Sequence, residues 1–341
     1  MKIRTGSIFL CSIAAIIGCG GNDPENAGPQ PAVFDGPRPM RIVATTGMVA
    51  DIVRQVAGDA AAVTALMGPT VDPHRHKPNR EDNQAIENAD IVFYSGLNLE
   101  GRMADTFARY GRNGKPVYAV TEKLDESQLR EPPEFDGHYD PHVWMDVTLW
   151  SECVGFVADA LAEFDPPNAE PYRANAAAYR AELERLDAYA KETIASIPAE
   201  HRTLVTSHDA FGYFGRAYGI EVSAVQGITT EAEAAIADVN ALVELIIQRK
   251  IPAIFVESSV PPKNIQHVME ACRAGGWDVR LGGELFSDAM GEEGAYEGTY
   301  IGMIDHNATM IARALGGNAP ERGMNGQLAV RPGRNQTLSK E

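Results

Sequence analysis

The sequence predicts an α/β protein in which two doubly wound parallel-sheet lobes are joined by one long backbone helix. Three observations lead to this prediction. The chain of 341 residues is long enough for two domains. Segments with strand and helix patterns alternate in both halves, which implies parallel sheets covered by helices on both faces. Between the halves, residues 166–198 contain no glycine and are rich in Ala, Glu, Arg and Leu, so they predict the linking helix.

The first half, residues 40–165, is expected to form the N-terminal lobe. Short apolar runs predict its strands at 41–47, 61–68, 90–96 and 115–121. Apolar residues at helical spacing predict helices at 48–58, 79–89 and 100–111, and a further helix at 147–164 closes the lobe.

The second half, residues 199–317, repeats this scheme and is expected to form the C-terminal lobe. Strands are predicted at 203–208, 221–227, 253–259 and 278–285. Helices are predicted at 210–219, 237–250, 262–276 and 299–317. The remaining residues, 318–341, show no apolar period and predict a disordered tail.

The N-terminus indicates export. After a positively charged start, residues 8–18 form an apolar run that is too short to cross a bilayer, so residues 1–18 are interpreted as a signal peptide. Small residues before Cys19 resemble a bacterial lipobox, which predicts a lipid on Cys19 and a flexible tether over 19–39. An ordinary secretory signal with an incidental cysteine is the alternative. The protein is then lipid-anchored to a bacterial membrane and faces the periplasm or the cell exterior.

Net charge excludes one class of partner. The formal charge of −17 argues against binding to nucleic acid or to an anionic membrane surface. An acidic surface suits a protein that handles cations, although it serves solubility equally well.

Four side chains that can bind a metal lie at predicted strand ends or on the loops that follow strands. They are His74 and His142 from the first half and His208 and Asp288 from the second. Because ligands of parallel α/β sheets bind beyond the carboxyl ends of the strands, we expect these four to converge between the lobes. Three imidazoles and one carboxylate suit Zn²⁺, Mn²⁺ or Fe²⁺.

The triplet Asp-Pro-His occurs twice and ends at His74 and at His142. Proline fixes its own φ and pushes the preceding residue into an extended conformation, so the triplet holds the imidazole on a stiff loop. Asp72 and Asp140 are placed to accept the second ring N–H of a metal-binding histidine. Taken singly, each histidine has an ordinary alternative as a polar surface group or a buried structural imidazole.

Two further residues are assigned near the four ligands. His76, two positions after the first triplet, is interpreted as an alternative ligand or a residue at the rim of the site. Glu257, at the end of a predicted strand, is interpreted as a carboxylate that supports the ligands. Asp288 has an alternative role as a helix N-cap.

Five motifs resemble those of the TroA-like family of zinc and manganese solute-binding proteins of ABC transporters. They are "VDPH", "DPHVWMD", "TSHDAFGYFGRAYGI", "FVESSVPPKNI" and "LFSDAMGEEGAYEGTYIGM", and the similarity runs from about residue 41 to residue 317. The resemblance implies two α/β lobes joined by one backbone helix, with the metal between them. It also implies that the ligands are His74, His142, His208 and Asp288.

As for partners, the resemblance implies delivery of the metal to a membrane permease driven by a cytoplasmic ATPase. We expect a monomer, and one Mn²⁺ or Zn²⁺ ion bound, with Fe²⁺ also compatible with the ligands. Zinc-specific relatives often carry a His-rich loop before the second ligand, where this chain has only His138. Many manganese-specific relatives have glutamate at the position of His208, so the ligand set leaves both metals open.

Two other functions are alternatives to metal capture. A zinc hydrolase needs an open metal position and a nearby base, whereas four protein ligands fill a tetrahedral site. The chain contains no HExxH motif, and Glu257 is the one carboxylate that could be imagined as a base. A lipid-tethered surface adhesin of the same fold is the third possibility and is compatible with metal binding.

Overall fold

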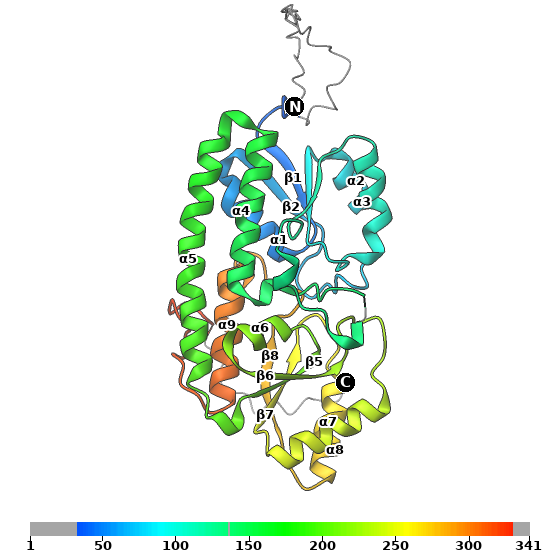
Figure 1. Ribbon diagram of the computed structural model, residues 1–341, viewed down its shortest axis with the longest axis vertical. Helices are drawn as coiled ribbons and strands as arrows, with labels where there is room; N and C mark the ends of the chain where they lie inside the picture. Colours follow the sequence, from blue (N-terminus) through cyan, green and yellow to red (C-terminus); the bar gives the residue numbers. More distant parts are fainter. Residues whose placement is uncertain (1–32, 136, 330–341) are drawn as a thin grey trace, which may run out of the picture. The chain divides into compact units, whose positions relative to one another are not determined.

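Four parallel strands form a sheet in the first half of the chain (Figure 1). They pair in the order β2-β1-β3-β4, and Met40 of the first strand aligns with Ala61 of the second. The strands are β1 (Met40–Ala44), β2 (Ala61–Ala65), β3 (Ile91–Tyr94) and β4 (Val117–Ala119). The helices between them are α1 (Gly47–Ala57), α2 (Arg80–Asn88) and α3 (Ala104–Arg112).

These boundaries come from a computed structural model, which describes residues 33–135 and 137–329. The predicted signal peptide, Cys19 and most of the predicted tether lie outside the described residues. Each described helix is too short or too polar to span a bilayer.

The second half of the chain has two parallel strand pairs. Strands β5 and β6 form one two-stranded sheet, β7 and β8 form another, and β5 packs next to β7. The strands are β5 (Thr203–His208), β6 (Glu221–Gln226), β7 (Ala253–Glu257) and β8 (Arg280–Leu285). The helices are α6 (Gly212–Tyr218), α7 (Ile236–Arg249), α8 (Lys263–Ala274) and α9 (Tyr300–Ala314).

Two long helices connect the halves. Helix α4 (Val147–Phe164) begins where the Asp146 carboxylate accepts backbone N–H groups of the first turn. Helix α5 (Ala169–Ala195) has 27 residues, so it is about 40 Å long. Its buried residues recur at alternating spacings of four and three, and this stripe faces α1, α4 and α9: Tyr172, Ala176, Tyr179, Leu183, Leu186, Ala190 and Thr193. The linking helix therefore packs along both halves (Figure 1).

One hydrophobic core runs through both halves. It contains Ile42 of β1, Leu183 of α5, Phe214 of α6 and Leu285 of β8 in a single cluster of buried side chains. Parallel strands with intervening helices and one long connecting helix confirm the predicted α/β class. The exact lobe boundaries stay predictions, because the core does not divide at residues 165 or 198.

The predicted disordered tail is partly wrong. Residues 318–329 lie against α9, where both carboxylate oxygens of Asp305 accept the backbone N–H of Met324 at 2.9 and 3.0 Å. Leu328 is buried, and the backbone N–H of Ala329 donates to Glu297. A buried carboxylate thus orders a segment whose composition alone predicts disorder. The rest of the predicted tail lies outside the described residues.

Candidate metal site

Four different elements place the four candidate ligands. His74 lies on the loop between β2 and α2, and His142 directly precedes the short 3₁₀ turn at Val143–Met145. His208 is the last residue of β5, and Asp288 follows the end of β8. All four are buried, with exposed fractions between 0 and 6%.

The structure brings the four side chains to one point. One ligand atom from each lies within 4.8 Å of all the others. The Nε2 atoms of His74 and His142 are 3.2 Å apart, and Asp288 approaches Nε2 of His142 at 3.4 Å and Nε2 of His208 at 3.2 Å. We call His74, His142, His208 and Asp288 the quartet.

Several polar atoms of the quartet have no hydrogen-bond partner. Among the described residues, Nε2 of His208 and both carboxylate oxygens of Asp288 are buried without one. Buried polar groups are almost always paired, since an unpaired one costs about 1–3 kcal/mol. Atoms of this kind, pointing at one another from two halves of the chain, are those that a cation would satisfy.

A carboxylate orients the ring of His142. Oδ1 of Asp140 lies 2.7 Å from Nδ1 of this histidine and also accepts its backbone N–H at 3.0 Å. Oδ2 of Asp140 accepts a hydrogen bond from Arg130, and Tyr213 donates to the Asp140 carbonyl at 3.0 Å. With Nδ1–H bonded to Asp140, Nε2 points into the quartet, as a metal ligand requires.

A second carboxylate orients the ring of His208. Oε2 of Glu257 is hydrogen-bonded to Nδ1 of His208, and Oε1 accepts the backbone N–H groups of Ser207 at 2.7 Å and of His208 at 2.9 Å. Both oxygens are therefore used in holding the end of β5. Glu257 is only 3% exposed. Its carboxylate therefore supports His208 and does not face water as a general base would.

Asp72 holds its histidine in another way than its sequence position suggests. Its Oδ1 accepts the backbone N–H of His74 at 2.9 Å, not the ring N–H. The second oxygen accepts a hydrogen bond from the hydroxyl of Thr230 in the other half of the chain, at 2.5 Å. His76 lies outside the quartet, where its Nε2 is 2.9 Å from Oδ2 of Asp82 at the start of α2.

The three imidazoles differ in pKa. Burial lowers the pKa of His74 to about 3, so this ring is neutral. Burial also opposes protonation of His142, but the hydrogen bond to Asp140 and the charges of Asp140 and Asp288 outweigh it and raise the pKa to about 9. For His208, burial acts downward, yet the charges of Glu257 and Asp288 raise the pKa well above its usual value.

Asp288 is ionised in the same network. Burial acts to raise the pKa of its carboxyl group, but the charges of His208 and His142 hold it well below the usual range. Without metal, the quartet therefore carries protons on two imidazoles. Those protons must leave when a cation binds, because only neutral imidazoles are ligands.

Sequence reasoning missed residues that join the two halves at this site. Trp144 donates its indole N–H to the Ser287 carbonyl at 2.9 Å, and Tyr300 donates to the Trp144 carbonyl at 2.7 Å. The Trp144 ring lies 5.2 Å from that of His142, centroid to centroid. Trp144, two residues after His142, was a sequence signal for a contact at the site. Its partner, Ser287, precedes Asp288 and could not be predicted from the sequence.

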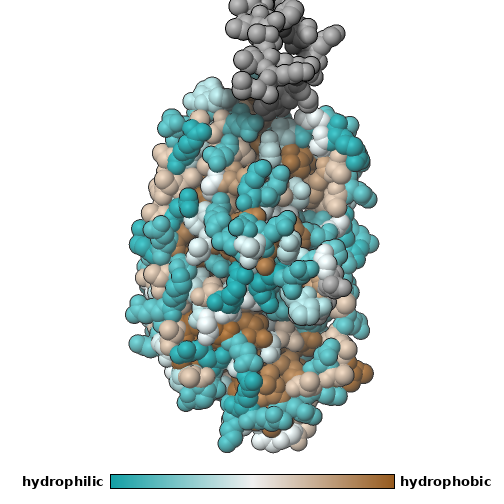
Figure 2. Space-filling model, in the orientation of Figure 1, coloured by the Kyte–Doolittle hydropathy of each residue, from teal (hydrophilic) through white to brown (hydrophobic). Residues whose placement is uncertain are grey.

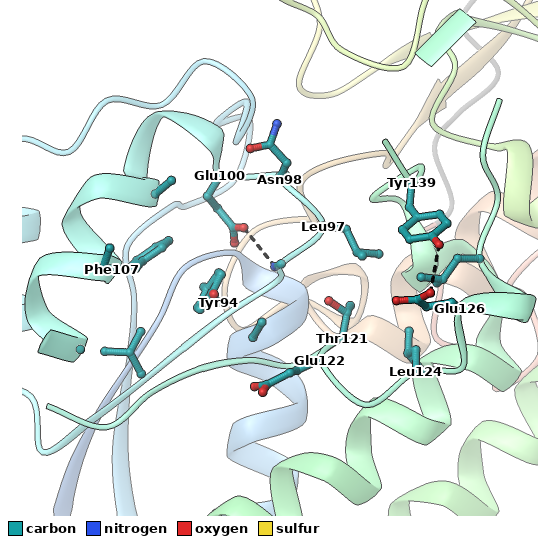
Figure 3. A pocket seen from close by; sticks show the side chains of 17 residues that line it. Tyr94, Leu97, Asn98, Glu100, Phe107, Thr121, Glu122, Leu124, Glu126 and Tyr139 are labelled. Carbon is teal, nitrogen blue, oxygen red and sulfur yellow. Dashed lines mark hydrogen bonds between the residues drawn. The ribbon is translucent and has the colours of Figure 1, made fainter. Parts of the chain in front are cut away.

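A separate cavity of about 560 Å³ lies in the first half, between α3 and the segment that follows β4 (Figure 3). Its walls include Tyr94, Phe107, Glu122 and Tyr139, and Glu100 hydrogen-bonds the backbone beside it. No member of the quartet lines this cavity. The metal site is thus a small buried cluster and is not part of an open substrate pocket.

Comparison with known proteins agrees with this chemistry. The family described as "Zinc-uptake complex component A periplasmic" matches residues 42–314. The chain belongs to this family. Members of the family are components of metal uptake, so the resemblance stated from the motifs is confirmed.

The relatives differ in the metal that they are named for. Zinc-binding protein TroA of Treponema pallidum (strain Nichols) is 45% identical over 288 residues, which is 84% of this chain and 92% of the relative. Manganese-binding lipoprotein MntA of Bacillus subtilis (strain 168) is 40% identical over 307 residues, or 90% of this chain and 97% of the relative.

Solved structures share the fold. The periplasmic zinc-binding protein TroA from Treponema pallidum superposes with a TM-score of 0.78 at 45% identity, covering 81% of this chain and 99% of that one. Fe(III)-bound YtgA from Chlamydia trachomatis gives a TM-score of 0.74 at 26% identity, covering 82% and 99%. The same architecture therefore occurs in proteins named for zinc and for iron.

Proposed function

We propose that the protein captures one divalent transition-metal ion, Mn²⁺ or Zn²⁺, outside the cytoplasmic membrane and delivers it to an ABC permease for import. The observation that carries this proposal is the quartet, a buried cluster of three imidazoles and one carboxylate with ligand atoms within 4.8 Å of one another. Such a donor set is borderline in softness and suits Mn²⁺, Zn²⁺ and Fe²⁺.

The ligands in this proposal are His74, His142, His208 and Asp288. Two come from each half of the chain, so the ion bridges elements that are far apart in sequence. Capture then proceeds by loss of protons from His142 and His208 and coordination by all four side chains. The Asp140 and Glu257 carboxylates already hold the two rings with Nε2 facing the quartet, which reduces the ordering needed on binding.

The anchor and the partners belong to the same proposal. Cys19 carries a lipid that tethers the protein to the membrane, where it faces the periplasm or the cell exterior. The permease and its cytoplasmic ATPase receive the ion from a monomeric binding protein. The named relative MntA is a lipoprotein, which supports the anchor.

A zinc hydrolase is not proposed. Four protein ligands leave no free position in a tetrahedral site for an activated water. The one carboxylate considered as a base, Glu257, uses both oxygens to hold the end of β5. Surface adhesion has no feature in its favour among the described residues.

Native mass spectrometry of the exported protein, with elemental analysis of the bound metal, tests the proposal. We expect one ion per chain in the wild type and none in His142→Ala or Asp288→Ala. His138→Ala, an exposed histidine four residues before the second ligand, is the matched control and is expected to keep its ion. Retention of the ion in both ligand variants, or hydrolysis of an ester or amide panel by the wild type alone, would overturn the proposal.

A further inference from the structure

We infer that Thr230 is a positioning residue for metal retention and that residues 228–235, between β6 and α7, form a latch over the side of the quartet where His74 lies. We call these residues the latch segment. This inference rests on the proposed function and concerns how long the ion stays bound, not which side chains bind it.

His74 is the member of the quartet nearest to solvent. Its side chain is 5% exposed, whereas those of His142, His208 and Asp288 are fully buried. Among the described residues, no carboxylate outside the quartet hydrogen-bonds the ring of His74. A route by which the ion leaves therefore runs past His74, the one imidazole that no such carboxylate holds in place.

The loop that carries His74 is held from the other half of the chain. Asp72 accepts the backbone N–H of His74 with one oxygen at 2.9 Å and the hydroxyl of Thr230 with the other at 2.5 Å. Thr230 is buried, at 4% exposure. The carboxylate of Asp72 thus ties the latch segment to the backbone of the ligand.

A second tie follows at the next residue. Glu231 forms an ion pair with Arg102, on the 3₁₀ turn Gly101–Met103 of the first half, at 2.5 Å. Both side chains of this pair are about two-fifths exposed, at 38% and 43%, so its strength is reduced by solvent screening. Two consecutive residues of the latch segment therefore grip two separate loops of the first half, and the buried tie of Thr230 is the stronger one.

Apart from buried Ile228 and Thr230 and half-buried Thr229 and Ala234, the latch segment is exposed to solvent. Residues 231–233 and 235–238 are exposed, apart from half-buried Ala234 between them, and Ile236 at the start of α7 is 81% exposed. Ala235, the N-cap residue of α7, provides no side-chain hydrogen bond to the first turn of the helix. On the face drawn in Figure 2, hydrophobic residues gather over the lower part, where the second half of the chain lies. Segments with few buried contacts open locally at low cost in free energy, so the latch segment can detach without unfolding the core.

The four ligands then set the coordination of the ion, and the bond between Thr230 and Asp72 sets how fast the ion leaves. While the Thr230–Asp72 bond is formed, the loop of His74 cannot move away from the other three ligands. When the bond breaks, the loop and its imidazole are free to swing outward, and the ion is left with three protein ligands. Thr230 therefore controls the rate of metal dissociation and leaves the coordination geometry unchanged.

Stopped-flow transfer of Zn²⁺ from the loaded full-length mature protein to a strong chelator tests this inference. Thr230→Val keeps the shape of the side chain and removes the donor. We expect dissociation to accelerate by about 10- to 100-fold, as for loss of one hydrogen bond to a buried carboxylate. Thr230→Ser keeps the hydroxyl and is expected to restore the wild-type rate. Thr64→Val, an exposed threonine of β2, is the matched control.

Two further readouts separate a latch from general destabilisation. The association rate and the visible spectrum of the Co²⁺-loaded protein are expected to be the same in Thr230→Val and wild type, because the four ligands are unchanged. Glu231→Gln tests the exposed tie without touching the buried one and is expected to accelerate dissociation by about two- to fivefold. It also keeps the inference testable if Thr230→Val does not fold.

Dissociation from Thr230→Val within twofold of that from Thr64→Val would overturn the latch, as would an altered Co²⁺ spectrum. If Thr230→Val does not fold, an unchanged rate in Glu231→Gln overturns it. A wild-type protein that binds no metal would overturn the proposed function instead, so the two failures are distinguishable.

Discussion

Replacing Glu257 with glutamine tests how far a residue that does not touch the metal sets its affinity. The side chain keeps its size, and its carbonyl oxygen can still accept the backbone N–H groups of Ser207 and His208. The other end becomes an NH₂ group, which is a donor and faces Nδ1 of His208. The imidazole then carries its proton on Nε2, the atom that points into the quartet.

The expected loss follows from this change of tautomer. Restoring the binding tautomer in the variant leaves two donors facing each other in a buried site. Removing a partner of this kind typically weakens metal binding by about 10- to 100-fold, or about 1.4–2.7 kcal/mol. Loss of the Glu257 charge also lowers the pKa of His208, so protons compete less with the metal in the variant. The deficit is therefore larger at about pH 9 than at about pH 6.5.

Competition titrations of Zn²⁺ and Mn²⁺ against chelators of known affinity measure the effect at both pH values. Glu244→Gln removes the same charge from an exposed position on α7 and serves as the control. Equal affinities in the two variants would refute the reasoning. So would a deficit in Glu257→Gln that grows as the pH falls, since that is the opposite sign.

Three other outcomes are expected. Metal affinity of the wild type rises with pH through neutrality, because protons on His142 and His208 must leave. Calorimetry in buffers of different ionisation enthalpy near pH 7 then shows release of about two protons. Metal at about a thousandfold excess over Kd stabilises the fold by about 4 kcal/mol, seen as a rise in Tm that a chelator reverses. Asp305→Ala frees residues 318–329, which limited proteolysis detects as new cleavage there, at a cost of about 1–3 kcal/mol in the free energy of unfolding.

Much of the fold was accessible from the sequence because local signals agree with it. Helix α4 has the predicted limits, since Asp146 supplies the N-cap and a proline pair at 166–167 follows its end. Helix α5 lies within the predicted range 166–198, since strong helix formers fill it and its buried residues keep a regular spacing. The alternation of strand and helix patterns was enough to predict parallel sheets covered by helices, but it does not fix the order of the strands within a sheet.

The supporting network was accessible only in part. The Asp-Pro-His triplets indicate where two ligands lie, and Asp140 bonds the ring of His142 as its position suggests. Asp72 occupies the same place in the other triplet but accepts a backbone N–H with one oxygen and the hydroxyl of Thr230 with the other. A partner 158 residues away leaves no local signal in the sequence. The order of residues 318–329 escaped prediction for the same reason.

The carboxylates bonded to His142 and His208 determine how the net charge of the site changes when the metal binds. Without the ion, two imidazolium groups face Asp288, and with the ion, two neutral rings and one divalent cation replace them. Both states have the same net electrical charge at this centre. A receptor that tells them apart must then sense differences in surface shape, and the two forms should migrate alike in native electrophoresis near neutral pH.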